Sequence, residues 1–199
     1  LAFVPLLGGE AYTLRLATMA CMYATMAASW NVIGGMAGYP SFATAAFFGL
    51  GAYTGGVLLA AGNPLAVAIL AAGAIAFAGA MLLGAVLMRL RGHYFAIASL
   101  AVAEVLRELT NSATDLTGGG MGLNIPLGTG DGVMDESTFY FYAMWSLLFL
   151  AVIVIVFIER SRLGFGLACI RQNESAADMI GVNGTLYKSL AFGFSGVFV

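Results

Sequence analysis

Three charged side chains inside an otherwise apolar stretch are the first candidates for chemistry. Glu104, Arg107 and Glu108 are three and four residues apart, which places them on one face of a helix. Glu104 comes ten residues after Tyr94, roughly 15 Å along a helix axis. Ionisable groups at such a depth in a bilayer tend to face the bundle interior and to mark a transport path. Two roles stay open: Glu104 and Arg107 line a translocation path, or the charges form an ion pair that fixes helix packing or marks a helix end in water.

Motifs for other chemistry are incomplete. GLGAYT at 49–54 begins like a dinucleotide-binding fingerprint but ends in threonine, and LTGGGMGL at 116–123 lacks the Lys-Ser/Thr of a phosphate-binding loop. One histidine and two distant cysteines, Cys21 and Cys169, do not suggest a metal site or a disulfide. A net charge of −2 without a basic stripe argues against a nucleic-acid partner. We therefore expect no ATP site, no metal and no cofactor in this chain, and we do not expect an enzyme.

A second candidate is a short polar stretch, RQNESAADMIGVN at 171–183, which lies between apolar segments. Ser175 is followed three residues later by Asp178, as in a capping box, and Gly181 is placed to end a helix in a left-handed turn. The predicted helix has about seven residues, roughly 10 Å, and is too short to be stable alone. Either a partner packs on it, or it is an incidental helical turn in a connecting loop.

The elements that position these residues are apolar helices. The chain is 61% hydrophobic and 9% charged, whereas a soluble domain is about 25% charged. Backbone groups in lipid need internal partners, so each apolar segment is predicted to be a helix. The segments run over about 11–33, 42–61, 65–88, 94–112 and 138–158, with a sixth from near residue 190. We predict an all-α, polytopic transmembrane bundle with about five complete spans and a truncated sixth. Residues 1–199 are expected to be one domain of a longer protein, incomplete at both ends.

Charge bias gives the expected orientation. Six of the eight basic residues fall in two loops, at 89–93 and 159–188, whereas the loop at 113–137 holds four acidic residues and no basic one. Cytoplasmic loops carry an excess of Lys and Arg. We therefore expect 89–93 and 159–188 to be cytoplasmic and 113–137 to be outside. The number of spans between these loops gives the same arrangement.

Several stretches resemble a known family of membrane proteins. The pattern Glu174-x-Ala176-Ala177-x-x-x-Gly181 resembles the EAA loop of ABC-importer permeases. Four longer stretches are similar to the LivM-type branch, the permeases for branched-chain amino acids. They are GYPSFATAAFFGLGAYTGG at 38–56, RLRGHYFAIASLAVAEVLRELTN at 89–111, LTGGGMGL at 116–123 and RSRLGFGLACIRQNESAADMIGVN at 160–183. The resemblance covers the chain from about residue 15 onward, and the order and spacing of the motifs make it specific.

The resemblance implies a transport subunit that lies in a bacterial inner (plasma) membrane. The subunit would import branched-chain or other hydrophobic amino acids. It implies cytoplasmic ATP-binding subunits that hydrolyse ATP on separate chains, a second, LivH-like permease and a periplasmic substrate-binding protein. The coupling helix, within the cytoplasmic loop 159–188, would comprise Glu174, Ala176, Ala177 and Gly181, whose small residues would fill a groove on the ATPase. Ser175 departs from the pattern, because alanine is common at that position.

Other functions are compatible with parts of the sequence. A related ABC permease for urea or a simple sugar would share every motif above. A self-sufficient secondary transporter or channel would need its own ion-coupling groups, for which Glu104, Arg107 and Glu108 are the candidates. A membrane enzyme is the least supported, because the sequence shows no nucleophile–base pair and no metal cluster.

Overall fold

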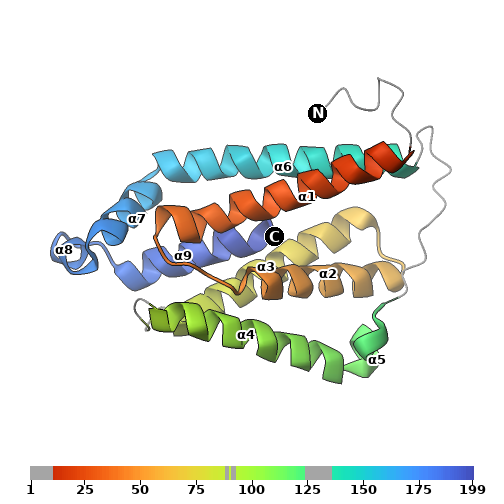
Figure 1. The fold of residues 1–199 in the computed structure, drawn as a ribbon, viewed down its shortest axis with the longest axis horizontal. Coiled ribbons are helices and arrows are strands. Elements are labelled where there is room, and N and C mark those ends of the chain that lie inside the picture. Colours follow the sequence, from red (N-terminus) through yellow and green to blue (C-terminus); the bar gives the residue numbers. More distant parts are fainter. Residues whose placement is uncertain (1–10, 88–89, 91–92, 124–135) are drawn as a thin grey trace.

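The computed structural model describes residues 11–87, 90, 93–123 and 136–199, and every regular element in these ranges is helical (Figure 1). The longer helices are α1 (Ala11–Asn31), α2 (Thr44–Ala60), α3 (Leu65–Leu87), α4 (His93–Ser112), α6 (Glu136–Arg160) and α9 (Gly184–Val197). The shorter ones are α5 (Thr114–Thr117), α7 (Arg162–Gln172) and α8 (Glu174–Met179), with a π-helical turn at Val32–Met36 and a 3-10 turn at Gly119–Met121. The predicted all-α fold is confirmed.

Within the described ranges, three helices are long and apolar enough to cross a membrane. They are Tyr12–Met36, Leu65–Leu87 and Ser137–Arg160, with 25, 23 and 24 residues, and a bilayer core requires about 20 residues of helix. The apolar helix α2 is shorter, at 17 residues, and α4 has 20 residues but carries three charged ones. The predicted apolar segments therefore all fold as helices, and three of them have full membrane length.

Small residues allow the helices to approach closely. Helices α3 and α9 pack side by side, and a Cβ added at Gly196 would lie 2.6 Å from the Cβ of Ala80. It would also lie 3.2 Å from the backbone oxygen of Ala76, which cannot move aside as a side chain does. Since the hydrophobic effect does not drive helices together in lipid, such close backbone contact is a main source of helix association there.

An aromatic cluster joins α2, α4 and α9. Phe192 of α9 packs edge-on against Phe47 of α2, with ring centroids 5.2 Å apart, and against Phe95 of α4, at 6.0 Å. Edge-to-face contact is the favoured geometry for aromatic pairs. This cluster belongs to a buried core that also includes residues of α7 and Ala177 of α8. The short helices α7 and α8 are thus packed on the bundle and do not form a detached loop.

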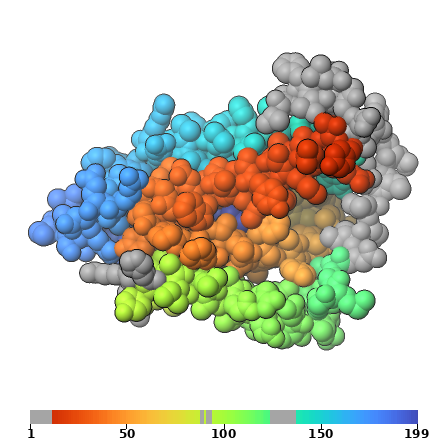
Figure 2. Space-filling view, in the orientation of Figure 1, coloured from red at the N-terminus to blue at the C-terminus, as the bar shows by residue number. Residues whose placement is uncertain are grey.

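Helices α7 and α8 lie at one end of the molecule, and the α2–α3 turn and α5 lie at the opposite end (Figures 1 and 2). The predicted loop 159–188 therefore contains two helices and the start of α9. Four residues that contributed to the predicted orientation lie outside the described residues: Arg89, Arg91, Asp131 and Asp135.

Candidate functional site

Helix α8 forms where the sequence predicts a short helix, but its cap differs. The Asn173 side chain accepts a hydrogen bond from the backbone N–H of Ala176 at 3.1 Å, so Asn173 is the N-cap. The predicted cap at Ser175 is wrong: the helix has already begun at Glu174, which makes Ser175 its second residue. Asparagine and serine are comparably good caps, so local preference alone does not decide between them.

The end of α8 is the predicted left-handed turn at Gly181. Gly181 has φ +84°, a conformation that glycine adopts without the steric cost paid by other residues. The backbone N–H of Val182 donates to the Ala177 oxygen at 3.0 Å, and that of Gly181 donates to the Asp178 oxygen at 3.1 Å. This pair of bonds is the Schellman motif. Helix α8 is therefore a six-residue helix with defined ends.

The four residues expected to form a coupling helix divide between two faces of this segment. Ala177 is 2% exposed and packs in the core, and Glu174 is held by contacts within the chain. Ala176 and Gly181 are exposed. Two neighbours that the sequence reading did not include are also exposed, Met179 at 84% and Ile180 at 68%. One face attaches α8 to the bundle, and the other presents small and apolar residues at the end of the molecule.

Glu174 is bound to two side chains that are distant in the sequence. Lys188 of α9 donates from Nζ to Glu174 Oε1 at 2.6 Å and to the Tyr39 hydroxyl oxygen at 3.0 Å. Tyr39, in the connection between α1 and α2, donates its hydroxyl to Glu174 Oε2 at 2.6 Å. The Lys188 ammonium also lies 4.4 Å from the centroid of the Tyr39 ring. We call these three residues the Tyr39–Glu174–Lys188 triad. Their separation along the chain is why the sequence did not reveal it.

The triad is buried on its Lys188 side. The Lys188 side chain is 1% exposed, whereas that of Glu174 is 22% exposed. A buried ammonium requires a charged or polar partner, because desolvation strongly disfavours it otherwise. Burial raises the pKa of the Tyr39 hydroxyl, and the hydrogen bond to Glu174 raises it further, while Lys188 acts in the opposite direction. The phenol therefore stays protonated at neutral pH, where it can donate to Glu174.

A second contact ties α7 to the end of α1. Arg171 donates from Nη1 to the backbone oxygen of Gly35 at 2.7 Å, in the π-helical turn Val32–Met36. Gly38, which follows this turn, has φ +75°, and a Cβ added there would lie 2.8 Å from Cγ of Arg171. The α1 end, the Arg171 side chain and the start of the α1–α2 connection thus fit closely together.

Substituting Gly38 by alanine is expected to lower the free energy of unfolding by about 1–2 kcal/mol through the left-handed backbone alone. Crowding of Arg171 should add to this loss. The matched control is Gly62→Ala, since Gly62 has φ +82° but no atom within 4 Å of the added Cβ. Thermal unfolding in detergent should show a lower midpoint for Gly38→Ala than for Gly62→Ala. Equal midpoints would mean that Arg171 moves aside without cost.

The α1–α2 connection also contacts two of the long helices. Trp30 of α1 donates from Nε1 to the backbone oxygen of Ser41 at 2.8 Å. The backbone N–H of Phe42 donates to the hydroxyl of Ser99, on α4, at 3.0 Å. The Tyr39 ring packs edge-on against Phe95 of α4, with centroids 5.4 Å apart. Residues 37–43 are therefore fixed to α1 and α4 as well as to the triad.

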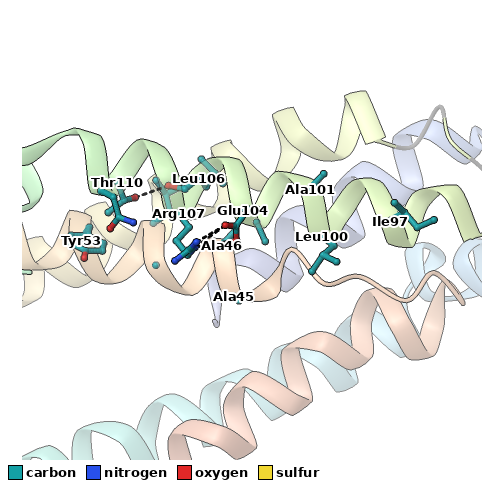
Figure 3. A pocket seen from close by; sticks show the side chains of 14 residues that line it. Ala45, Ala46, Tyr53, Ile97, Leu100, Ala101, Glu104, Leu106, Arg107 and Thr110 are labelled. Carbon is teal, nitrogen blue, oxygen red and sulfur yellow. Dashed lines mark hydrogen bonds and ion pairs between the residues drawn. The ribbon is translucent and has the colours of Figure 1, made fainter. Parts of the chain in front are cut away.

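Two of the three predicted charged residues, Glu104 and Arg107, lie elsewhere, in an open groove between α2 and α4 (Figure 3). The groove has a volume of about 720 Å³ and its lining is mainly apolar. Glu104 and Arg107 are among the lining residues and form an ion pair within α4, with Arg107 Nη2 2.5 Å from Glu104 Oε1. The two side chains are 64% and 65% exposed. An exposed pair three residues apart on one helix adds little to stability, and both of its members lie on α4. The geometry therefore gives no support to a role in fixing α4 against another helix of the described chain.

The long apolar helices define the class of the protein: it is an α-helical membrane protein. It also has a short helix exposed at one end and a charged pair in an apolar groove. The sequence profile of the family described as branched-chain amino acid transport system / permease component matches residues 12–198. The chain belongs to this family. The predicted resemblance to the permeases for branched-chain amino acids is confirmed by this membership, and the family consists of transport permease components, not of enzymes.

Two curated relatives carry the name high-affinity branched-chain amino acid transport system permease protein LivM. The protein from Salmonella typhimurium is 29% identical over 209 residues, which cover 92% of this chain and 49% of the relative. The protein from Escherichia coli strain K12 is 28% identical over 212 residues, which cover 94% and 50%. The chain spans about half the length of the curated relatives it matches. No solved structure matches the chain.

Proposed function

We propose that the chain is part of the permease subunit of an ATP-driven (ABC) importer for branched-chain or other hydrophobic amino acids. The observation that carries the proposal is α8, which is attached by Ala177 and Glu174 and exposes its other face at the end of the molecule (Figure 2). Family membership and the two LivM relatives support amino-acid transport. The proposed partners are cytoplasmic ATP-binding subunits, a second, LivH-like permease and a periplasmic substrate-binding protein in a bacterial inner membrane.

The exposed face of α8 suits a protein partner. Met179 and Ile180 are 84% and 68% exposed, and they lie beside Ala176 and Gly181, whose small size lets a partner approach the backbone. Flexible methionine side chains are common at binding surfaces because they adapt to the partner's shape. We define the docking surface as Ala176, Met179, Ile180 and Gly181, and we propose that it seats in a groove of the ATP-binding subunit.

Charge supports a cytoplasmic position for this end. Arg160, Arg162 and Arg171 are all exposed there, and positive residues favour the cytoplasmic side. Asp115, in α5, lies at the opposite end (Figure 1). We therefore propose that the loop 159–188 is cytoplasmic and that 113–137 is periplasmic.

We further propose that the α2–α4 groove is part of the amino-acid path. An α-amino acid carries an ammonium and a carboxylate a few bonds apart, and Glu104 and Arg107 present the complementary charges at the groove. Arg107 would bind the carboxylate in bidentate fashion, and Glu104 would accept from the ammonium. The aliphatic side chain would lie against apolar residues such as Leu100 and Leu106. Urea carries neither charge, so the pair favours an amino acid over urea as substrate.

The docking proposal is tested by placing a bulky residue on α8. Gly181→Trp is expected to reduce co-purification with the importer's ATP-binding subunits at least about tenfold, because an interface core tolerates little added volume. Gly62→Trp is the matched control: both glycines have a positive φ near 80° and open space at the Cβ, but Gly62 lies at the other end of the molecule (Figure 1). A side chain at positive φ strains the backbone equally in both variants. Only Gly181→Trp should therefore lose binding to the ATP-binding subunits.

Equal binding by the two variants would contradict docking through α8. The alternative of a secondary transporter is tested separately in proteoliposomes. Uptake of labelled leucine by the purified chain and its second permease, without ATP-binding subunits, would overturn the proposed ATP-driven function. Uptake that requires both the ATP-binding subunits and ATP would support it.

A further inference from the structure

We infer that the Tyr39–Glu174–Lys188 triad is a mechanical link, which transmits displacement of α8 to the α1–α2 connection and, through it, to the α2–α4 groove. The inference rests on the proposed function, in which α8 is moved by an ATP-binding subunit. It assigns a positioning role to Tyr39 and Lys188, which lie in neither the docking surface nor the groove.

The first step is the attachment of α8. Glu174 is the first residue of α8, so a displacement of the helix also displaces its carboxylate. Each carboxylate oxygen is 2.6 Å from its partner, Lys188 Nζ on one side and the Tyr39 hydroxyl on the other. Separation would leave the buried Lys188 ammonium without its counter-ion, at a high cost in free energy. The triad therefore favours joint movement of α8, the Tyr39 side chain and α9.

The second step runs through the α1–α2 connection. Tyr39 packs on Phe95 of α4, and Phe42 is hydrogen-bonded to Ser99, one turn further along that helix. Ala45 and Ala46, which follow the connection at the start of α2, line the groove. A shift of residues 37–43 thus reaches both helices that wall the groove: α4 through direct contacts with Phe95 and Ser99, and α2 through the continuous chain. Contiguity of this kind shows that a route exists, and coupling along it must be measured.

The third step is a place where the chain can bend. The π-helical turn Val32–Met36 interrupts the α-helical pattern of α1 immediately before the connection, and such turns recur at functional sites. Gly38 follows it with a left-handed backbone. These residues can absorb a change in direction while α1 itself stays straight. Arg171 of α7 donates a hydrogen bond to the Gly35 oxygen in the same turn. This is a second contact between the α7–α8 end of the molecule and the α1–α2 connection.

The test separates transmission from docking and from folding. Tyr39→Phe removes the hydroxyl and keeps the ring that packs on Phe95. In proteoliposomes with the complete importer, this variant is expected to bind the ATP-binding subunits normally but to transport at least about fivefold fewer leucine molecules per ATP hydrolysed. Tyr187→Phe is the control, because it makes the same chemical change at a residue next to Lys188 that is outside the triad.

A second variant covers the case in which Tyr39→Phe folds poorly. Glu174→Gln/Lys188→Met removes both charges of this ion pair together, and it should show the same loss of coupling with docking retained. Combining Tyr39→Phe with this pair should add little further loss, since all three residues act in one link. A wild-type ratio of transport to hydrolysis in these variants, with docking intact, would overturn the link and leave the proposed function standing. Loss of docking in Tyr39→Phe would also overturn the link, because the triad would then act in docking itself. Failure of the proposed function is detected separately: Gly181→Trp would then bind the ATP-binding subunits normally.

Discussion

Lys188→Met is expected to lower the free energy of unfolding by about 3 kcal/mol, the low end of the range for breaking a buried ion pair. Methionine fills similar space and is apolar, so the packing around this position should survive. The loss comes from Glu174, whose carboxylate would lose the ammonium that lies 2.6 Å from its Oε1. Its side chain is 22% exposed, and partial contact with solvent keeps the cost from being larger. Chemical unfolding in detergent micelles measures the difference.

The double variant Glu174→Gln/Lys188→Met is the control for this prediction. It removes both charges, and replacing an ion pair with groups of similar size is often close to neutral. We expect the double variant to recover most of the stability that Lys188→Met loses. If both variants lose the same amount, the cost lies in the packing of the lysine stem and the buried-charge explanation is wrong.

Arg107→Gln is expected to raise the KM for leucine uptake at least about tenfold, because it removes a charge-assisted bond to the substrate carboxylate. The folded yield should hardly change, since the Glu104–Arg107 pair is exposed on α4. Docking on the ATP-binding subunits should also be unaffected, since the groove is remote from α8. Uptake of labelled leucine over a range of concentrations gives the KM.

A charge-reversed variant separates recognition from structure. Glu104→Arg/Arg107→Glu keeps an ion pair with the same spacing on the same helix face, but it exchanges the positions of the two charges. A structural pair would tolerate the exchange, whereas a site oriented along α4 for a zwitterion would not. A KM close to that of the unaltered chain in this variant would exclude the pair from substrate recognition.

Much of the fold is predictable because it is locally determined. Backbone groups in lipid must pair within the helix, and the lengths of the apolar runs then set the helix bounds. The segment predicted at 65–88 is α3 at Leu65–Leu87, and Asn63 and Pro64 mark the turn before it. The π-helical turn at Val32–Met36 was not predicted, because its apolar and glycine residues do not distinguish it from an α-helix. Helix α7 was also missed: within 159–188 its charged residues mask the core-facing Leu167 and Ile170.

The candidate site was predictable only in part, because only some of its features are determined by local sequence. The helix-ending glycine at 181 acts through local conformation, and it is where the sequence places it. The partners of Glu174 act across 14 and 135 residues, and no local pattern indicates such a contact. Lys188 is an example of a residue whose contacts no local pattern indicates. The sequence analysis counted it among the basic residues of the expected cytoplasmic loop 159–188, whereas the structure buries it on α9, in contact with Tyr39 and Glu174 of α8.

The burial of Lys188 also has a consequence for chemical labelling. It is the one lysine in the sequence, and its side chain is 1% exposed. Reagents that acylate lysine side chains need an accessible amine, and the folded chain keeps its one lysine side chain buried beneath Glu174 and Tyr39. The rate at which this lysine is acylated therefore reports how often the segment around it opens. A single mass-spectrometric signal can thus follow local unfolding of this end of the protein without any introduced probe.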